Sequence, residues 1–375
     1  MKLFSTALAA LSLLVATTNG TLMLRMEAEG KSNPEQQNPM QHKHCYSTSS
    51  IECNLTGTYK NDTDISSCTS ITVDSLRVPP GVTLDLSKAK KGAIIQFKGT
   101  TIFGAQKWAG PLVLLGGTDL TVKGNGVLKD RGSWYWKQGK SITRPVFFRL
   151  KNVTSSTVSE ITIKNMPFRT FSIQNCTNTT LTGITIDSRA GNGIAKNTDG
   201  FGMSLSDHVT ITNNTIYNQD DCLAMSSSTN TVFTGNYCCG GNGISIGSIG
   251  GNSVNQSTTV QGLLVKGNTV VDSVNGLRIK TIIDLKGLVS DVMYVDNDLI
   301  NVKNAIVIRS DYSKKQGGYT NTATSQVQIT GITVSGLTGS AKNLYAIYTN
   351  PSVVSNWNLS HINVTTSAAG LLRFT

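Results

Sequence analysis

The sequence lacks a second long apolar run after its amino terminus. Residues 3–15 are mostly apolar, follow Lys2 and precede small polar residues, which is typical of a secretory signal peptide over residues 1–20. No later stretch approaches the roughly 20 apolar residues of a membrane-spanning helix. We therefore expect an exported, soluble, extracellular protein with no membrane partner.

Helical periodicity is missing as well. From Val146 onward, short stretches rich in β-branched residues alternate apolar and polar positions, as in TVSEITIKN from Thr157 and TLTGITIDS from Thr180. Alternation with period two predicts β-strands. The stretches recur irregularly, roughly every 20 to 35 residues, and repeats of that length indicate a solenoid.

The predicted fold is therefore all-β: a right-handed parallel β-helix that forms one domain over residues 45–375. Residues 21–44 are polar and contain Pro34 and Pro39, so we expect a polar lead or propeptide there. An antiparallel sandwich or barrel is the alternative. It would need regular Asn-Gly or Asp-Gly hairpin turns between the stretches, and these do not occur regularly.

Acidic residues are fewer than basic ones, with 22 Asp and Glu against 33 Lys and Arg and a formal net charge of +11. A basic surface on an exported protein favours a polyanionic partner, and outside the cell that partner is an acidic polysaccharide rather than a nucleic acid. The alternative is that the charge only aids solubility.

The chain has seven cysteines, so at least one thiol stays unpaired. Two pairings would close loops of about 15 residues: Cys53 with Cys68, and Cys222 with either Cys238 or Cys239. The expected disulfide cysteines are Cys53, Cys68, Cys222 and Cys238, whereas Cys45, Cys176 and Cys239 have no assigned partner. Nine Asn-x-Ser/Thr sequons after residue 20 agree with a glycosylating secretory route.

Three aspartates and one asparagine are spaced by about one coil. KNTDGF holds Asp199, NQDDC holds Asp220 and Asp221, and GGNGIS holds Asn242; 21 residues separate Asp199 from Asp220 and Asp221 from Asn242. Residues one coil apart in a β-helix lie about 4.8 Å apart, so these side chains should meet on one face. Stacked carboxylates repel, which lets one site hold an acid beside a base, as glycoside hydrolysis requires.

Asp220 and Asp221 are consecutive and would point to opposite faces of a regular strand. Both reach one site only if the backbone turns or bulges there. Exposed turn acids and a calcium site are the alternatives, but calcium would need more oxygen ligands, and nearby cations argue against it.

Two such cations occur in NGLRIKT, where Arg278 and Lys280 share one face of a predicted strand. A guanidinium beside an ammonium suits a sugar carboxylate. Taken alone, the motif is more typical of a solvated basic face.

Four segments together closely resemble the signature segments of the polygalacturonases, glycoside hydrolase family 28. They are NTDG at Asn197, QDDC at Gln219, GGNGISIGS at Gly240 and RIK at Arg278. Upstream, CNLTGTYKNDTDISSC and RPVFFRL look like the amino-terminal coils of fungal and oomycete members. The resemblance implies a secreted β-helix that hydrolyses the α-1,4 linkages of polygalacturonate with inversion. We expect an endo-acting monomer that needs no metal and no other cofactor.

The resemblance also implies a role for each site residue. Asp220 would be the general acid, and Asp199 and Asp221 would activate the attacking water. The implied substrate-binding residues are Asn197, Gln219, Asn242, Arg278, Lys280 and Tyr312.

One position departs from the family pattern. The third family segment reads Gly-His-Gly, where this chain has Gly241, Asn242 and Gly243. An amide hydrogen-bonds a hydroxyl or a carboxylate but does not titrate. Two functions follow: a polygalacturonase of normal or reduced rate, or a non-catalytic homologue that binds pectin or a plant polygalacturonase-inhibiting protein.

Overall fold

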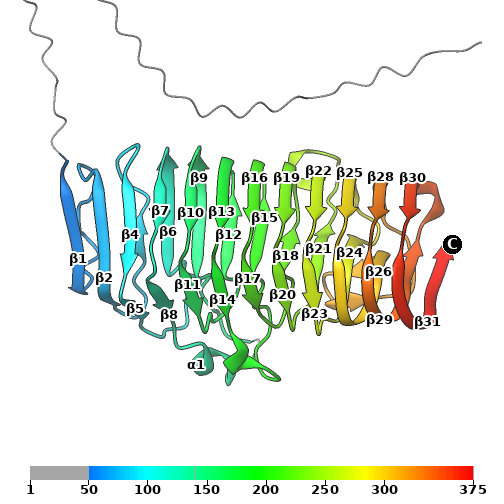
Figure 1. Ribbon diagram of the computed structural model, residues 1–375, viewed down its shortest axis with the longest axis horizontal. Coiled ribbons are helices and arrows are strands. Elements are labelled where there is room, and N and C mark those ends of the chain that lie inside the picture. The colour runs from blue at the N-terminus through cyan, green and yellow to red at the C-terminus, as the bar shows by residue number, and fades with distance from the viewer. Residues whose placement is uncertain (1–49, 140, 375) are drawn as a thin grey trace, which may run out of the picture. The chain divides into compact units, whose positions relative to one another are not determined.

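The computed structural model describes residues 50–139 and 141–374, which all belong to one compact unit. The predicted signal peptide and polar lead, together with Cys45, lie outside the described residues. The described residues form 31 strands, and all the strand pairs are parallel except that of β26 with β27. Figure 1 shows these strands side by side, coil after coil in chain order. The parallel β-helix is thereby confirmed, and the antiparallel alternatives are excluded.

Each coil contributes one strand to each of three parallel sheets. The first sheet contains β3 (Leu84–Leu86), β6 (Val113–Thr118), β9 (Phe148–Thr154), β12 (Phe171–Gln174), β15 (Phe201–Ser204), β18 (Leu223–Met225), β21 (Ile244–Ile249) and β24 (Asn275–Ile282). The second contains β1 (Glu52–Thr58), β2 (Ser70–Val78), β4 (Ile94–Lys98), β7 (Thr121–Lys123), β10 (Thr157–Ser159), β13 (Thr177–Thr182), β16 (Asp207–Thr212), β19 (Ser228–Thr234), β22 (Thr259–Lys266), β25 (Lys286–Val295), β28 (Gln326–Ser335) and β30 (Val354–Ser360).

The third sheet contains β5 (Thr100–Phe103), β8 (Val127–Lys129), β11 (Thr162–Lys164), β14 (Thr185–Asp187), β17 (Thr215–Tyr217), β20 (Tyr237–Cys239) and β23 (Thr269–Val271). Three long strands continue from the third sheet into the first: β26 (Asp298–Ser313), β29 (Thr338–Thr349) and β31 (Asn363–Phe374). The short strand β27 (Gly318–Tyr319) folds back on β26 as an antiparallel hairpin.

Helical segments are few and short. They are α1 (Gly132–Trp136), η1 (Arg189–Gly191), η2 (Gln256–Thr258) and η3 (Pro351–Val353). Within the described residues, no helix has the length and hydrophobicity needed to cross a membrane.

The core is built from side chains that repeat at the same register on successive coils. Phe148, Phe171 and Phe201 are paired in register in the first sheet, with ring centroids 5.4 Å and 5.2 Å apart. All three are fully buried. Each coil therefore covers the apolar surface of its neighbour, which is the main stabilising contribution in a solenoid.

A column of buried asparagines stabilises the turns between the second and third sheets. Side-chain amide hydrogen bonds run along the column from Asn214 to Asn236 at 2.9 Å, from Asn236 to Asn268 at 3.1 Å, and from Asn268 to Asn297 at 2.9 Å. Their oxygens also accept backbone N–H bonds from the preceding coil. Backbone groups that the turns would leave unpaired are satisfied in this way.

Both predicted disulfides form, Cys53–Cys68 and Cys222–Cys238, each with a Cα–Cα distance of 5.9 Å. Cys238 is buried toward the core, where it meets Cys222 on the preceding coil, whereas Cys239 follows it on the strand and faces outward. That alternation decides between the two candidate partners. Cys176 is a buried free thiol and Cys239 a half-buried one.

Candidate active site

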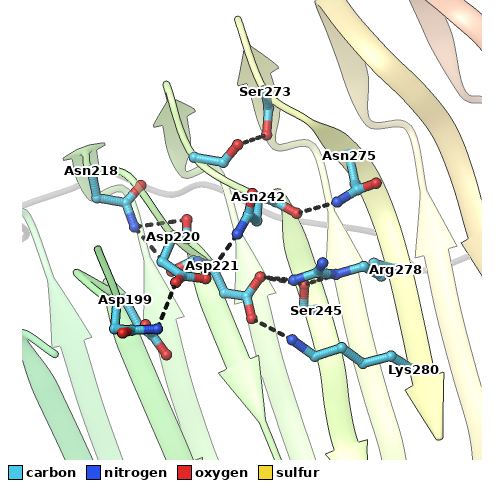
Figure 2. Close-up of polar contacts among 12 residues, drawn as sticks. Asp199, Asn218, Asp220, Asp221, Asn242, Ser245, Ser273, Asn275, Arg278 and Lys280 are labelled. Carbon is cyan, nitrogen blue, oxygen red and sulfur yellow. Dashed lines mark hydrogen bonds and ion pairs between the residues drawn. The ribbon is translucent and has the colours of Figure 1, made fainter. Parts of the chain in front are cut away.

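Two loops that precede first-sheet strands on successive coils carry the predicted acidic residues, and the loop on the next coil carries Asn242 (Figure 2). Phe201 pairs with Leu223, and Leu223 pairs with Ile244. Asp199 and Asp221 each lie two residues before their strand, so they occupy equivalent positions one coil apart. The offset between these two coils is 22 residues, from Phe201 to Leu223. The predicted offset of 21 residues would have placed Asp199 level with Asp220 instead.

The bend required by the consecutive aspartates is present. Asp220 and Asp221 lie outside regular strand, between β17 and β18. The backbone N–H of Asp221 donates to Asp220 Oδ1 at 2.9 Å, which holds the bend. Asp220 is half-buried and Asp221 is 2% exposed.

Two side-chain amides hold the carboxylate of Asp220. Asn242 Nδ2 donates to Oδ1 at 2.9 Å, and Asn197 Nδ2 donates to Oδ2 at 3.2 Å. The backbone N–H of Asn242 also donates to the Asp220 carbonyl at 2.9 Å. Asn242 therefore faces the predicted general acid and fixes its orientation through a neutral donor.

The two glycines beside Asn242 allow its loop to approach the neighbouring coils. A Cβ at Gly241 would lie 2.2 Å from the Asp220 carbonyl oxygen, and one at Gly243 would lie 2.1 Å from the Asn275 carbonyl oxygen. Gly243 also has a positive φ of 86°. Any larger residue would push Asn242 away from Asp220.

Cations surround Asp221. Arg278 Nη2 donates to Oδ1, Ser245 Oγ donates to the same oxygen at 2.9 Å, and Lys280 Nζ donates to Oδ2 at 3.1 Å (Figure 2). Arg278 Nε also donates to Ser245 Oγ at 2.9 Å. The predicted Arg278–Lys280 pair therefore shares one strand face and is directed at the Asp221 carboxylate.

Asp199 has the opposite surroundings. The residue is 7% exposed, and the nearest cationic group to its carboxylate is Arg169 Nε at 3.7 Å. Within the described residues its carboxylate accepts no hydrogen bond of good geometry. Burial, and then the charges of Asp220 and Asp221, raise the pKa of Asp199 to about 7.

A buried arginine orients Asn197. Arg144 Nη2 donates to Asn197 Oδ1 at 3.1 Å, and Nη1 donates to the carbonyls of Lys196 at 2.6 Å and Pro167 at 3.3 Å. Because Arg144 is a donor only, it fixes the amide with its oxygen toward the guanidinium and its nitrogen toward Asp220.

Both the oxygen and the nitrogen of the Gln219 side-chain amide form hydrogen bonds within the protein. Its oxygen accepts from Ser188 and Thr198, each at 2.9 Å, and its nitrogen donates to the Ser188 carbonyl and to Asn192, each at 2.8 Å. Gln219 thus ties the loop of η1 to the loop that carries Asp199.

Aromatic rings line the side of the site toward the carboxyl terminus. Lys280 Nζ lies 5.5 Å from the ring centroid of Tyr312, which meets Tyr319 edge-on at 6.0 Å. Tyr319 comes from β27 and stacks on Arg309 at 4.2 Å. Arg309 in turn makes a two-bond ion pair with the buried Asp311, at 2.8 and 2.6 Å.

The structure therefore brings together Asp199, Asp220, Asp221, Asn197, Asn242, Arg278 and Lys280, with Tyr312 beside Lys280. Sequence reasoning missed Arg144, Arg169, Ser245 and Tyr319. Ser245 alone carried a signal, because it lies one coil before Arg278 in register. Across residues 50–139 and 141–374, no three His, Cys, Asp or Glu side chains group as a metal site would require.

Comparison with known proteins points to one family. Residues 68–371 match the family described as Glycosyl hydrolases family 28. The chain is 41% identical over 322 residues to the endo-polygalacturonase of Sclerotinia sclerotiorum, which covers 81% of this chain and 82% of the relative. It is 46% identical over 296 residues to the probable endopolygalacturonase I of Aspergillus flavus, which covers 77% and 79%.

Solved structures show the same architecture. Endopolygalacturonase I from Stereum purpureum, complexed with two galacturonates, matches with a TM-score of 0.59 at 26% identity, over 85% of this chain and 100% of the other. The endo-xylogalacturonan hydrolase from Aspergillus tubingensis matches with a TM-score of 0.75 at 24% identity, over 87% and 96%; this likeness shows the fold alone.

Proposed function

Because the chain belongs to glycosyl hydrolase family 28, we propose that it is a polygalacturonase that cuts within polygalacturonate chains with inversion. Hydrolysis of a glycosidic bond is the chemistry of the family, and the relatives above are named as endopolygalacturonases. The observation that carries the proposal is the cluster of three carboxyl groups on adjacent coils, held in three different environments.

Asp220 is the proposed general acid. It is the least buried of the three aspartates, and the two amides that hold it carry no charge. Burial raises the pKa of the neighbouring Asp199 to about 7, so Asp199 holds a proton below that pH and can pass it to Asp220. That proton is available to the leaving oxygen of the glycosidic bond, as an inverting mechanism requires.

Asp221, together with Asp199, is the proposed activator of the attacking water. Arg278 and Lys280 neutralise the charge of the Asp221 carboxylate, so it persists in a buried position. The base role of Asp199 needs its proton to move to Asp220, so the two groups act as one coupled unit.

Arg278 and Lys280 are also the proposed ligands of the substrate carboxylate, with Tyr312 beside them. Lys280 uses one of its three N–H donors on Asp221, which leaves donors for a galacturonate. Asn197 and Gln219 were predicted to bind substrate. We propose that both mainly hold the catalytic loops, since the Gln219 amide is fully used within the protein.

The catalytically silent alternative rests on Asn242 alone and gains no support from the comparisons. Asn242 keeps a direct bond to Asp220, so the position is still built to orient the acid. We further propose export through the amino-terminal signal peptide, a monomeric state, and recognition by plant polygalacturonase-inhibiting proteins.

Reducing-end release from polygalacturonate tests the function. The native protein should release reducing ends with and without a chelator, and Asp220→Asn should lose roughly 100 to 10,000 fold in kcat. Asn242→His, assayed in parallel, measures how much kcat changes when a histidine replaces the amide. A native protein that binds polygalacturonate without releasing ends, and gains turnover in Asn242→His, would reject the proposal in favour of a binding protein.

A further inference from the structure

A second concave surface lies away from the catalytic residues. It is a groove of about 780 Å³ between α1 and the outward side of β5 and β8, and we call it the α1 groove. Figure 1 shows α1 projecting from the stack beside β8 and β11. Its lining residues are Ile102, Lys129, Asp130, Arg131, Gly132, Ser133, Trp134, Lys137, Gln138 and Asn165. None of these residues contacts Asp199, Asp220 or Asp221.

Three exposed cations line the α1 groove: Lys129, Arg131 and Lys137. Within the described part of the chain, none of them forms an ion pair. Lys129 is also paired in register with the exposed Lys164 on the next coil, which lies outside the groove lining and is followed in register by Asp187. Like charges directly opposite on neighbouring strands are destabilising, so an anionic ligand would relieve this repulsion.

The acidic residue in the lining does not offset these charges at the surface. Asp130 is 2% exposed and points inward from the end of β8. Burial raises its pKa to about 7, against smaller lowering effects from the backbone and the charge of Arg131. The accessible part of the α1 groove is therefore uniformly cationic.

The α1 groove also offers apolar and amide contacts of the kind that sugars use. Trp134 is 39% exposed and is held edge-on against the buried Tyr135 at 4.9 Å. Its backbone carbonyl accepts a bond from Gln138 Nε2 at 2.8 Å. A partly exposed ring on an anchored helix can stack against the apolar face of a sugar. Asn165 and Gln138 add amides for hydroxyl groups.

We propose that the α1 groove binds a strand of acidic polysaccharide as an accessory site, separate from the catalytic residues. Cations that follow one another at the coil spacing suit a chain of carboxylates, and the Trp134 ring suits its sugar faces. The choice of polygalacturonate as that polymer rests on the proposed function. Binding there would keep the protein on the polymer between cuts.

The test compares a groove variant with a control of equal charge change. The groove variant is Lys129→Gln/Lys137→Gln/Trp134→Leu; the control is Lys266→Gln/Lys286→Gln, two exposed lysines on β22 and β25 that form no ion pair within the described residues. Both are made in an Asp220→Asn background, so that polymer is not consumed. Binding to insoluble de-esterified polygalacturonate is measured by co-sedimentation, with soluble polyglutamate as competitor.

The groove variant should bind at least about fivefold more weakly than the control, and the difference should shrink at high salt. With Asp220 intact, both should hydrolyse a galacturonate trimer at the native rate. Equal binding by groove and control variants would overturn the proposal, as would polyglutamate competing as well as polygalacturonate. If binding depends on the groove but the protein with Asp220 intact hydrolyses nothing, the proposed function is refuted while the proposed accessory site in the α1 groove is retained.

Discussion

Asp199 and Asp221 lie at the same register position on adjacent coils, yet their surroundings are opposite. Asp221 is held by Arg278, Lys280 and Ser245, whereas Asp199 accepts no hydrogen bond of good geometry within the described residues and has only Arg169 at 3.7 Å. The aspartates themselves are the same residue at the same backbone position. The surroundings of each carboxyl group are therefore decided by which residues the adjacent coils bring to it.

The contrast divides the site along the coil axis. Coils toward the carboxyl terminus supply two close cations from β24, and coils toward the amino terminus supply burial, neutral donors such as Asn197 and one more distant cation, Arg169. Asp220 lies between them in a bend and is held by one amide from each side. A stacked fold can thus place an acid beside a base by giving successive coils different side chains.

Replacing Arg278 should have the largest effect on the contrast between Asp221 and Asp199. Arg278→Met leaves Asp221 buried with Lys280 as its remaining ion partner, so we expect a loss of about 3 kcal/mol in the free energy of unfolding at pH 7. Urea denaturation measures this. Arg278→Met/Asp221→Asn should recover most of the loss, because the uncompensated charge is gone. A single variant as stable as the native protein would show that Asp221 does not depend on Arg278.

The raised pKa of Asp199 predicts a specific dependence of stability on pH. The pKa in the folded state is about 7 against 3.8 when unfolded, so the folded protein binds more protons between these values. The free energy of unfolding should therefore fall as pH rises from about 4 to about 7. In Asp199→Asn the free energy of unfolding should fall less over this pH range. The difference from the native protein should be roughly 4 kcal/mol at most.

Asp130 provides a matched control for this prediction. It is also buried, and its pKa is likewise raised to about 7, but it lies in the lining of the α1 groove. Asp130→Asn should flatten the same pH window of stability while hydrolysis of a galacturonate trimer continues. Asp199→Asn should abolish that hydrolysis. Unfolding curves that keep the native slope in both variants would contradict the assigned burial effect.

Arg144→Lys should weaken the orientation of the acid through Asn197. A lysine cannot reach two carbonyls and the Asn197 amide together, so we expect kcat to fall about tenfold with KM within about twofold. Steady-state kinetics with a thermal unfolding control measures this. A drop in melting temperature without any change in kcat would show that Arg144 stabilises the fold but does not orient Asp220 through Asn197.

Asn242→Ala should have the smallest effect of this series. It removes one of three donors to the Asp220 carboxylate and leaves Asn197 and the Asp221 backbone N–H. One such bond is worth about 1 kcal/mol, which corresponds to a fall of about fivefold in kcat. An unchanged kcat would mean that the amide contributes nothing to catalysis.

The sequence predicted the fold and the meeting of Asp199, Asp220, Asp221 and Asn242, because alternation and coil spacing are local properties. The register was one residue off for Asp199, since coil offsets are not constant: 22 residues from Phe201 to Leu223, but 277 − 244 = 33 from Ile244 to Leu277.

Arg144 and Tyr319 could not be found in this way. Arg144 reaches Asn197 from 53 residues upstream, across neighbouring coils, through a side chain that local patterning does not place. Tyr319 enters by a hairpin between the end of the long strand β26 and the short strand β27, and this hairpin breaks the parallel repeat. Contacts of this kind depend on loops between sheets, whose paths period-two alternation does not determine.

Direct titration of the Asp199 carboxyl tests the central claim that neighbouring coils set the protonation of the site. The carboxyl ¹³C shifts of aspartate-labelled protein, followed from pH 4 to pH 9 and assigned with Asp199→Asn and Asp130→Asn, give the midpoint. We predict that Asp199 titrates near pH 7 and that its signal is absent in Asp199→Asn. A midpoint near 4, as for an exposed aspartate, would contradict the account.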